Sequence, residues 1–177
     1  MGQLRSTKNG QVWQTDFIIG VSIFTIAMIL FITQMNRIEI TTDRSNDLLE
    51  EASFISIQLM TEGIPVDWTN ETVLQPGIVK NYRINETKWT TFVQMDEPRL
   101  RSLLRVHHPF FIFLSDESSC IIKTQGNFGA GSEVEIDEEG GCVTSEDIQI
   151  DAQNLVQIKR IALYNEKITT ITTYVWD

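Results

Sequence analysis

This 177-residue sequence has only two histidines and two cysteines, and their spacing fits no catalytic motif. His107 and His108 are adjacent, and adjacent residues of a strand point to opposite faces, so we expect them not to share a metal ion. The sequence has no G-x-S-x-G motif, and neither Cys120 nor Cys142 belongs to a C-x-x-C pair. We therefore expect no enzyme activity, no cofactor and no zinc or redox site, with a membrane-anchored hydrolase as the alternative.

The acidic run EVEIDEEGG, residues 133 to 141, is the best candidate for a metal site. Glu133, Glu135 and Asp137 would share one face of a strand, and calcium prefers clustered oxygen ligands. The run lacks the spacing of a D-x-D-x-D-G calcium loop. Because a charged run before a turn is usually solvated, we predict no bound metal here and keep calcium as the alternative.

The two cysteines, Cys120 and Cys142, enclose a glycine-rich segment. If this part of the chain is exported to an oxidising compartment, a disulfide between them is favoured. In the chain-entropy model a ring of this size stabilises a fold by about 3 kcal/mol. The alternative is two unpaired thiols buried as small apolar side chains.

Two N-x-T sequences, Asn70-Glu71-Thr72 and Asn85-Glu86-Thr87, fit the acceptor pattern for N-linked glycosylation. Modification requires export and an exposed loop, and both conditions are expected for this region. Such patterns also arise by chance. Asn70 and Asn85 are the predicted glycosylation sites.

An acidic residue, Asp16, stands at the start of the longest apolar run, which extends from Phe17 to Thr33 without a charged side chain. A membrane-spanning helix needs roughly 17–25 mostly apolar residues, and a buried core helix of such uniform composition is unusual in a small protein. A charge inside a span costs roughly 2.5–3.5 kcal/mol and needs a partner. The alternative places Asp16 in the headgroup region, where an acid in the first turn suits the helix dipole.

The charges that flank the run predict its orientation. Arg5 and Lys8 precede it, whereas only Asp16 and Glu39 of the 24 acidic residues come before residue 41. This asymmetry favours a cytoplasmic N-terminus and an extracellular C-terminal region, with one pass through the cell membrane. No A-x-A-like site follows the run, so we expect it to be retained rather than removed as a secretory signal. The net charge of −10 argues against nucleic acid as a partner.

The helical pattern continues beyond the apolar run. No proline or glycine occurs between Val21 and Gly63, and an apolar stripe recurs at helical spacing at Leu48, Ala52, Ile55 and Leu59. One helix from about residue 12 to 61, stopped by Gly63-Ile64-Pro65, is the predicted structure. The alternative breaks the helix between residues 43 and 47, where Ser45 or Asn46 could cap a second helix.

The sequence beyond residue 63 predicts a head rich in strands. Residues 66–95 resemble a loop, and Asp96 could cap a short helix through Arg105. The strand-like runs are Phe110–Leu114, Cys120–Thr124, Glu133–Asp137, Leu155–Tyr164 and Lys167–Trp176. The last two flank Asn165-Glu166 and predict a hairpin. The expected fold is α+β, with a long N-terminal helix, first transmembrane and then amphipathic, packed on an antiparallel sheet.

The stretch from Lys8 to Phe17 resembles an archaeal type IV pilin-like precursor with a class III signal peptide. It has a basic leader, Gly10 at a junction, Gln11 after it and an acid soon inside the apolar helix. The resemblance implies that a prepilin peptidase cleaves after Gly10 and that the helix is kept. It also implies that the freed α-amine of Gln11 pairs with Asp16 of the same or a neighbouring subunit. Asn9 stands where a basic residue is commoner, and Asp16 is the sixth residue after the cut instead of a glutamate at the fifth.

The resulting organisation is a leader at 1–10, a transmembrane helix at 11–36, its extracytoplasmic continuation at 37–62 and a β-rich head at 63–177. The expected partners are the lipid bilayer, the prepilin peptidase and other pilin-like subunits. The expected function is that of a pilin-like or pseudopilin-like structural subunit. The alternative is a single-pass membrane-anchored binding protein that does not polymerise.

Overall fold

The computed structural model describes residues 9–138 and 141–177, and within the first helix it describes no side chains for residues 9–15 and 34–44. The chain divides into two compact units, Met1–Arg44 and Ser45–Asp177. Helix α1 (Asn9–Leu59) belongs to both, because its last turns lie in the second unit.

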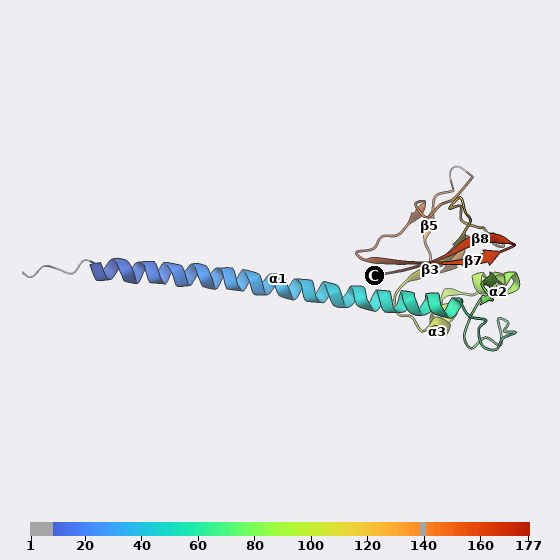
Figure 1. Cartoon of the computed structure of the whole chain (residues 1–177), viewed down its shortest axis with the longest axis horizontal. Helices are drawn as coiled ribbons and strands as arrows, with labels where there is room; N and C mark the ends of the chain where they lie inside the picture. The colour runs from blue at the N-terminus through green and yellow to red at the C-terminus, as the bar shows by residue number, and fades with distance from the viewer. Residues whose placement is uncertain (1–8, 139–140) are drawn as a thin grey trace, which may run out of the picture. The chain divides into compact units, whose positions relative to one another are not determined.

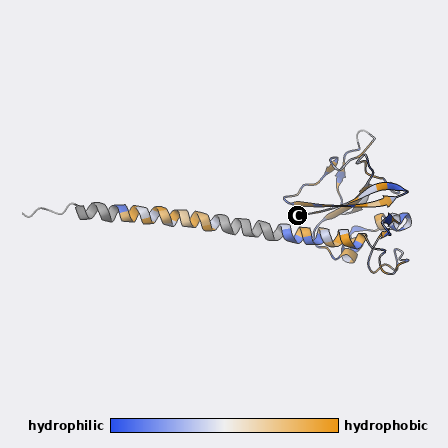
Figure 2. Ribbon diagram, in the orientation of Figure 1, coloured by the Kyte–Doolittle hydropathy of each residue, from blue (hydrophilic) through white to orange (hydrophobic). Residues whose placement is uncertain are grey.

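Helix α1 is continuous over 51 residues, as the single-helix prediction required, and no break occurs between residues 43 and 47. The segment Asp16–Thr33 is long and apolar enough to cross a membrane, and none of it is buried within the protein. Figure 2 colours most of this part of the ribbon as hydrophobic. A helix that is apolar on every side requires an apolar medium around it.

The second unit contains a six-stranded sheet in the order β1-β2-β7-β8-β3-β4 and a separate two-stranded sheet, β5-β6 (Figure 1). The remaining elements are β1 (Val79–Lys80), β2 (Arg83–Ile84), α2 (Glu86–Val93), α3 (Glu97–Leu104), β3 (Phe110–Ser115), β4 (Gly129–Gly131), β5 (Glu135–Ile136), β6 (Ile148–Gln149), β7 (Leu155–Tyr164) and β8 (Lys167–Trp176). Adjacent strands are antiparallel except β2 and β7, which are parallel at Arg83 and Leu163. The sheet is therefore mixed, whereas a purely antiparallel one was expected.

Alternate residues of the central strands feed two apolar clusters, one on each face of the main sheet. The cluster on one face contains Phe110, Ile112 and Val175 together with the apolar stripe of α1. All four residues of that stripe are fully buried: Leu48, Ala52, Ile55 and Leu59. On the other face Phe111 and Phe113 form a second cluster that includes Tyr174, Trp176, Ile121, Val143 and Ile148. The predicted packing of the helical stripe on a sheet is confirmed.

The hairpin of β7 and β8 forms with the predicted boundaries, and its turn residues Asn165 and Glu166 have φ values of 51° and 65°. Both values lie in the left-handed region that a tight two-residue hairpin turn requires. The predicted helix from Asp96 is also present as α3. It ends at Arg105, whose φ of 56° is typical of a left-handed C-cap.

Three predictions were wrong in detail. Residues 120–124 form no strand and make only isolated bridges, because the chain reverses at Gln125 and Gly126, both with positive φ. The strand expected at 133–137 is reduced to β5. Residues 66–95 are not loop throughout: α2 forms, and Asn85 is its N-cap, with its side-chain oxygen accepting a hydrogen bond from the Lys88 backbone N–H at 3.1 Å.

Candidate functional site

The hydroxyl side chains of the apolar segment Asp16–Thr33 bond to its own backbone. The hydroxyls of Ser22 and Thr25 donate to the carbonyls of Ile18 and Val21, each at 2.8 Å, and Thr33 donates to Leu30 at the same distance. A hydroxyl that bonds to the preceding turn costs little in hydrocarbon, where water is absent. The segment therefore has the composition of a membrane anchor or of a signal sequence.

The residues predicted for processing lie at the beginning of α1. Gly10 and Gln11 are within its helical backbone, but their side chains are outside the described residues. Asp16 is exposed and marks the first residue of the apolar segment. Its predicted pairing with the α-amine of Gln11 concerns a cleaved chain and stays a prediction.

In the second unit, Glu51 connects α1 to the segment that leads into β3. Its carboxylate accepts hydrogen bonds from the backbone N–H of His107, at 3.1 and 3.2 Å, and from the backbone N–H of His108 at 3.1 Å. Nδ1 of His108 lies 3.2 Å from the same carboxylate, but it makes no hydrogen bond. The backbone donors therefore define this contact.

A second polar contact joins α1 to the sheet. Ser56 is 2% exposed, and its hydroxyl accepts a hydrogen bond from Nε of Arg160 on β7 at 2.8 Å. Burying a hydroxyl without a partner costs free energy, and Arg160 removes that cost. Together with the buried stripe, Glu51 and Ser56 fix the rotation of α1 about its axis relative to the sheet.

A pocket of about 480 Å³ lies beside the Glu51 contact. It is lined by Asp47, Glu50, Glu51, Phe54, Arg105, Val106, His107 and His108. The lining offers carboxylates and imidazoles but no hydroxyl or thiol nucleophile, and Glu51 is already engaged by backbone donors. In this lining Glu51 holds the backbone N–H groups of His107 and His108.

The acidic run that was weighed as a calcium site is exposed. Glu133, Glu135 and Asp137 are exposed, and Val134 and Ile136 between them are half-buried. Within residues 9–138 and 141–177 no group of three or more histidine, cysteine or acidic side chains is placed to hold a metal ion.

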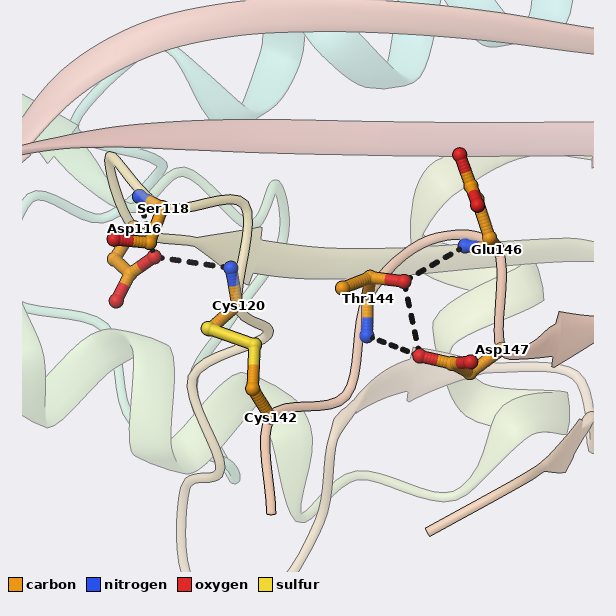
Figure 3. The surroundings of a disulfide bond; sticks show 7 residues. All are labelled: Asp116, Ser118, Cys120, Cys142, Thr144, Glu146 and Asp147. Atoms are coloured by element: carbon orange, nitrogen blue, oxygen red, sulfur yellow. Dashed lines mark hydrogen bonds between the residues drawn. A yellow bond between two sulfur atoms is a disulfide. The ribbon is translucent and has the colours of Figure 1, made fainter. Parts of the chain in front are cut away.

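Cys120 and Cys142 form a disulfide with an S–S distance of 1.98 Å and Cα atoms 5.3 Å apart (Figure 3). A hydrogen-bonded polar turn lies next to each of the two cysteines. Asp116 accepts the backbone N–H of Cys120 at 3.0 Å, and Asp147 accepts the backbone N–H of Thr144 at 2.7 Å. The latter hydrogen bond lowers the pKa of Asp147. The disulfide thus closes the segment that covers the second apolar cluster.

The two predicted glycosylation residues are both exposed. Asn70 lies in a turn, where Thr72, the third residue of the acceptor pattern, accepts a hydrogen bond from the backbone N–H of Thr69 at 2.9 Å. Asn85 caps α2 through its side-chain oxygen. Whether either is modified stays a prediction.

Sequence reasoning did not identify Glu51, Arg160 or Lys88 as structural contacts. Nζ of Lys88 donates to the backbone carbonyls of Glu62 and Val66, and burial lowers the pKa of its ammonium group. It thereby holds the loop that follows α1. No periodicity identifies such residues, because each binds a partner that is distant in the sequence: backbone atoms for Glu51 and Lys88, and the Ser56 hydroxyl for Arg160.

Comparisons of the chain with models of known protein families, with curated proteins and with solved structures found no match. An apolar N-terminal helix followed by a sheet-rich domain is compatible with a pilin-like layout.

Proposed function

We propose that this protein is a pilin-like structural subunit, anchored in the cell membrane by α1 and displaying its sheet-rich head outside the cell. One observation carries the proposal: α1 is a single helix whose first part is exposed and apolar and whose last part packs one buried stripe into the core of the head. Such a helix serves as an anchor and as part of the core of the head.

Processing is the second part of the proposal. A prepilin peptidase would cleave after Gly10, and the new ammonium group of Gln11 would offset the cost of Asp16 at the membrane boundary. The support is the resemblance of residues 8–17 together with the exposed position of Asp16 at the edge of the apolar segment. Other pilin-like subunits are the proposed partners.

Two substitutions separate cleavage from assembly. In cells that contain a prepilin peptidase, Gly10→Val should leave the leader attached, whereas Asp16→Ala should be cleaved normally and should not assemble. Immunoblotting measures the leader, and recovery of the head in sheared extracellular material measures assembly. Asp47→Ala, at an exposed acid of the second unit, is the control and should behave as the wild type. Normal cleavage of the Gly10 variant would refute the processing site.

Anchoring has its own test. Ile26→Lys places a charge in the middle of the apolar segment, at a cost of roughly 2.5–3.5 kcal/mol on insertion scales. We expect the variant to be lost from the alkali-resistant membrane fraction. Ile57→Lys, at a site that is 60% exposed in the second unit, should stay in that fraction. Equal membrane retention of the two variants would show that α1 is not the anchor.

A membrane-anchored binding protein that does not polymerise is the second candidate. It is favoured by an open depression of about 780 Å³ in the head. The depression is lined by Glu133, Val134, Glu135, Ile148, Gln149, Ile150, Asp151 and Trp176. This function needs no cleavage and no acid at the membrane boundary, so both Gly10→Val and Asp16→Ala should leave it intact.

A further inference from the structure

Strand β7 has one open edge. It pairs with β8 along its whole length, from Leu155 to Tyr164. On its other side, within the described residues, it pairs only with β2, at Leu163. The part of β7 from Leu155 to Ile161 is therefore an uncovered strand edge.

The direction of the backbone groups along this edge follows from one hydrogen bond. The Leu163 N–H donates to the carbonyl of Tyr82 at 2.8 Å, on the side away from β8. In an antiparallel pair the backbone N–H and C=O groups of successive residues point to alternate sides. Those of Gln157, Lys159 and Ile161 therefore point to the same side as those of Leu163, away from β8. All three residues are exposed. A row of free N–H and C=O groups is a template for an added strand.

The open edge is basic, although the chain as a whole carries a net charge of −10. Lys159 and Arg160 are adjacent and exposed, and neither makes an ion pair with the residues that the structure describes. Pairing of β7 with β7 of another copy about its middle would bring these like charges together, which is unfavourable. The edge instead fits an extended segment that alternates acidic and apolar residues.

The chain itself contains such a segment. Glu133 and Glu135 are exposed, and Val134 and Ile136 alternate with them. Among the residues that the structure describes, β5 pairs with β6 alone. The Asp137 N–H donates to Asp147, toward the β6 side, at 3.0 Å. By alternation, the backbone groups of Val134 and Ile136 point away from β6 and are directed to receive a strand.

We propose that residues 133–136 of one copy add to the open edge of β7 in a second copy in parallel orientation. Val134 and Ile136 then bond to the backbone of β7, and Glu133 and Glu135 lie on the same face as Lys159. The contact joins two different surfaces, so each copy keeps one free donor segment and one free acceptor edge. A contact of this kind propagates into a ring or a filament. The inference rests on the proposed structural-subunit function, since it specifies how the heads of neighbouring subunits meet.

Crosslinking of the full-length chain in detergent tests the contact. Isotope-labelled and unlabelled copies are mixed and treated with a carbodiimide, which joins an amine directly to a carboxylate. We expect peptides in which Lys159 of one copy is bonded to Glu133 or Glu135 of the other. Absence of these mixed peptides would overturn the proposal.

Charge exchange adds a control for specificity. Lys159→Glu alone, and Glu133→Lys with Glu135→Lys, should each weaken association of the copies by about fivefold or more, because an unfavourable pair replaces a favourable one. Mixing the two variants should restore association, since each edge again meets an opposite charge. Lys167 is exposed on β8, and Lys167→Glu should leave the association of the copies unchanged. Failure of the mixture to recover would overturn the proposed pairing.

Lys159→Pro tests the backbone separately from the charge. Its N–H points to the open edge, so proline removes no hydrogen bond to β8 and is tolerated in an edge strand. Association should be lost while the thermal transition and the disulfide stay as in the wild type, whereas Lys159→Gln should be affected less. Cleavage after Gly10 should be normal in every variant, so loss of the contact and loss of processing can be told apart.

Discussion

Glu51 of α1 accepts hydrogen bonds from the backbone N–H of His107 with both of its carboxylate oxygens, at 3.1 and 3.2 Å. The donors belong to the main chain, so the contact does not depend on the imidazole. It joins the helix to the segment that enters β3, the strand that contributes to both apolar clusters. The helix is therefore part of the head's structure.

Removal of this carboxylate should weaken the head. We expect Glu51→Ala to lower the free energy of unfolding by about 1.5–3 kcal/mol, since hydrogen bonds to a charged group are lost. Glu51→Gln keeps an oxygen acceptor and should cost less. Denaturant unfolding of the detergent-solubilised chain, followed by tryptophan fluorescence, measures the change. Glu50→Ala, at the adjacent exposed acid, is the control, and an equal loss there would contradict the role of Glu51.

The stripe on α1 offers a matched pair of isoleucines. Ile55 is fully buried and Ile57 is 60% exposed. Ile55→Ala should lower the free energy of unfolding by about 2–5 kcal/mol, because it removes buried apolar contacts and leaves a cavity. Ile57→Ala should change it by about 0.5 kcal/mol or less. Similar losses at both sites in the same unfolding assay would show that the helix does not pack as described.

Reduction of the disulfide should destabilise the head. Opening the ring between Cys120 and Cys142 should lower the free energy of unfolding by about 3 kcal/mol in the chain-entropy model. Differential scanning calorimetry with and without reductant measures the shift in Tm. The double variant Cys120→Ser, Cys142→Ser should have the lowered Tm in both conditions. A wild-type Tm that does not respond to verified reduction would contradict the stabilising role.

Acid should remove the stabilisation that Glu97 provides. The hydrogen bond from Arg101, with a second from Ser132 at 2.7 Å, lowers the pKa of Glu97 below its ordinary value of 4.5. Because the pKa is lower in the folded state, this stability is present above pH 4.5 and is lost as the pH falls through the folded-state pKa. In unfolding measured between pH 7 and 3, the free energy of unfolding of Glu97→Gln should fall less over this pH range than that of the wild type. An equal fall in both would contradict the role assigned to Glu97.

Local patterns in the sequence predict the elements with strong periodicity. The continuous helix follows from the absence of proline and glycine and from the stripe that includes Leu48 and Leu59, and the β7–β8 hairpin follows from two β-rich runs around Asn165. The disulfide follows from two cysteines in a region expected to be exported. Each of these features depends on neighbours in the sequence or on composition alone.

Features set by distant contacts could not be read in this way. Helix α2 is short and weakly amphipathic, and Trp89 within it is held by a hydrogen bond from its indole N–H to Thr124, 35 residues away. The parallel pairing of β2 with β7 involves one register position, Arg83 with Leu163. Glu51 resembles any solvent-facing acid of a helix until the fold places His107 beside it.

Mass spectrometry of the chain extracted intact from membranes of cells with a prepilin peptidase tests the proposed subunit most directly. The predicted result is a mature chain that begins at Gln11 and retains the apolar segment Asp16–Thr33. An extracted chain that still carries residues 1–10, in cells where a known peptidase substrate is cleaved, would contradict the pilin-like account. A chain cut after residue 33 would contradict it as well, because the helix would then have served only as a secretory signal.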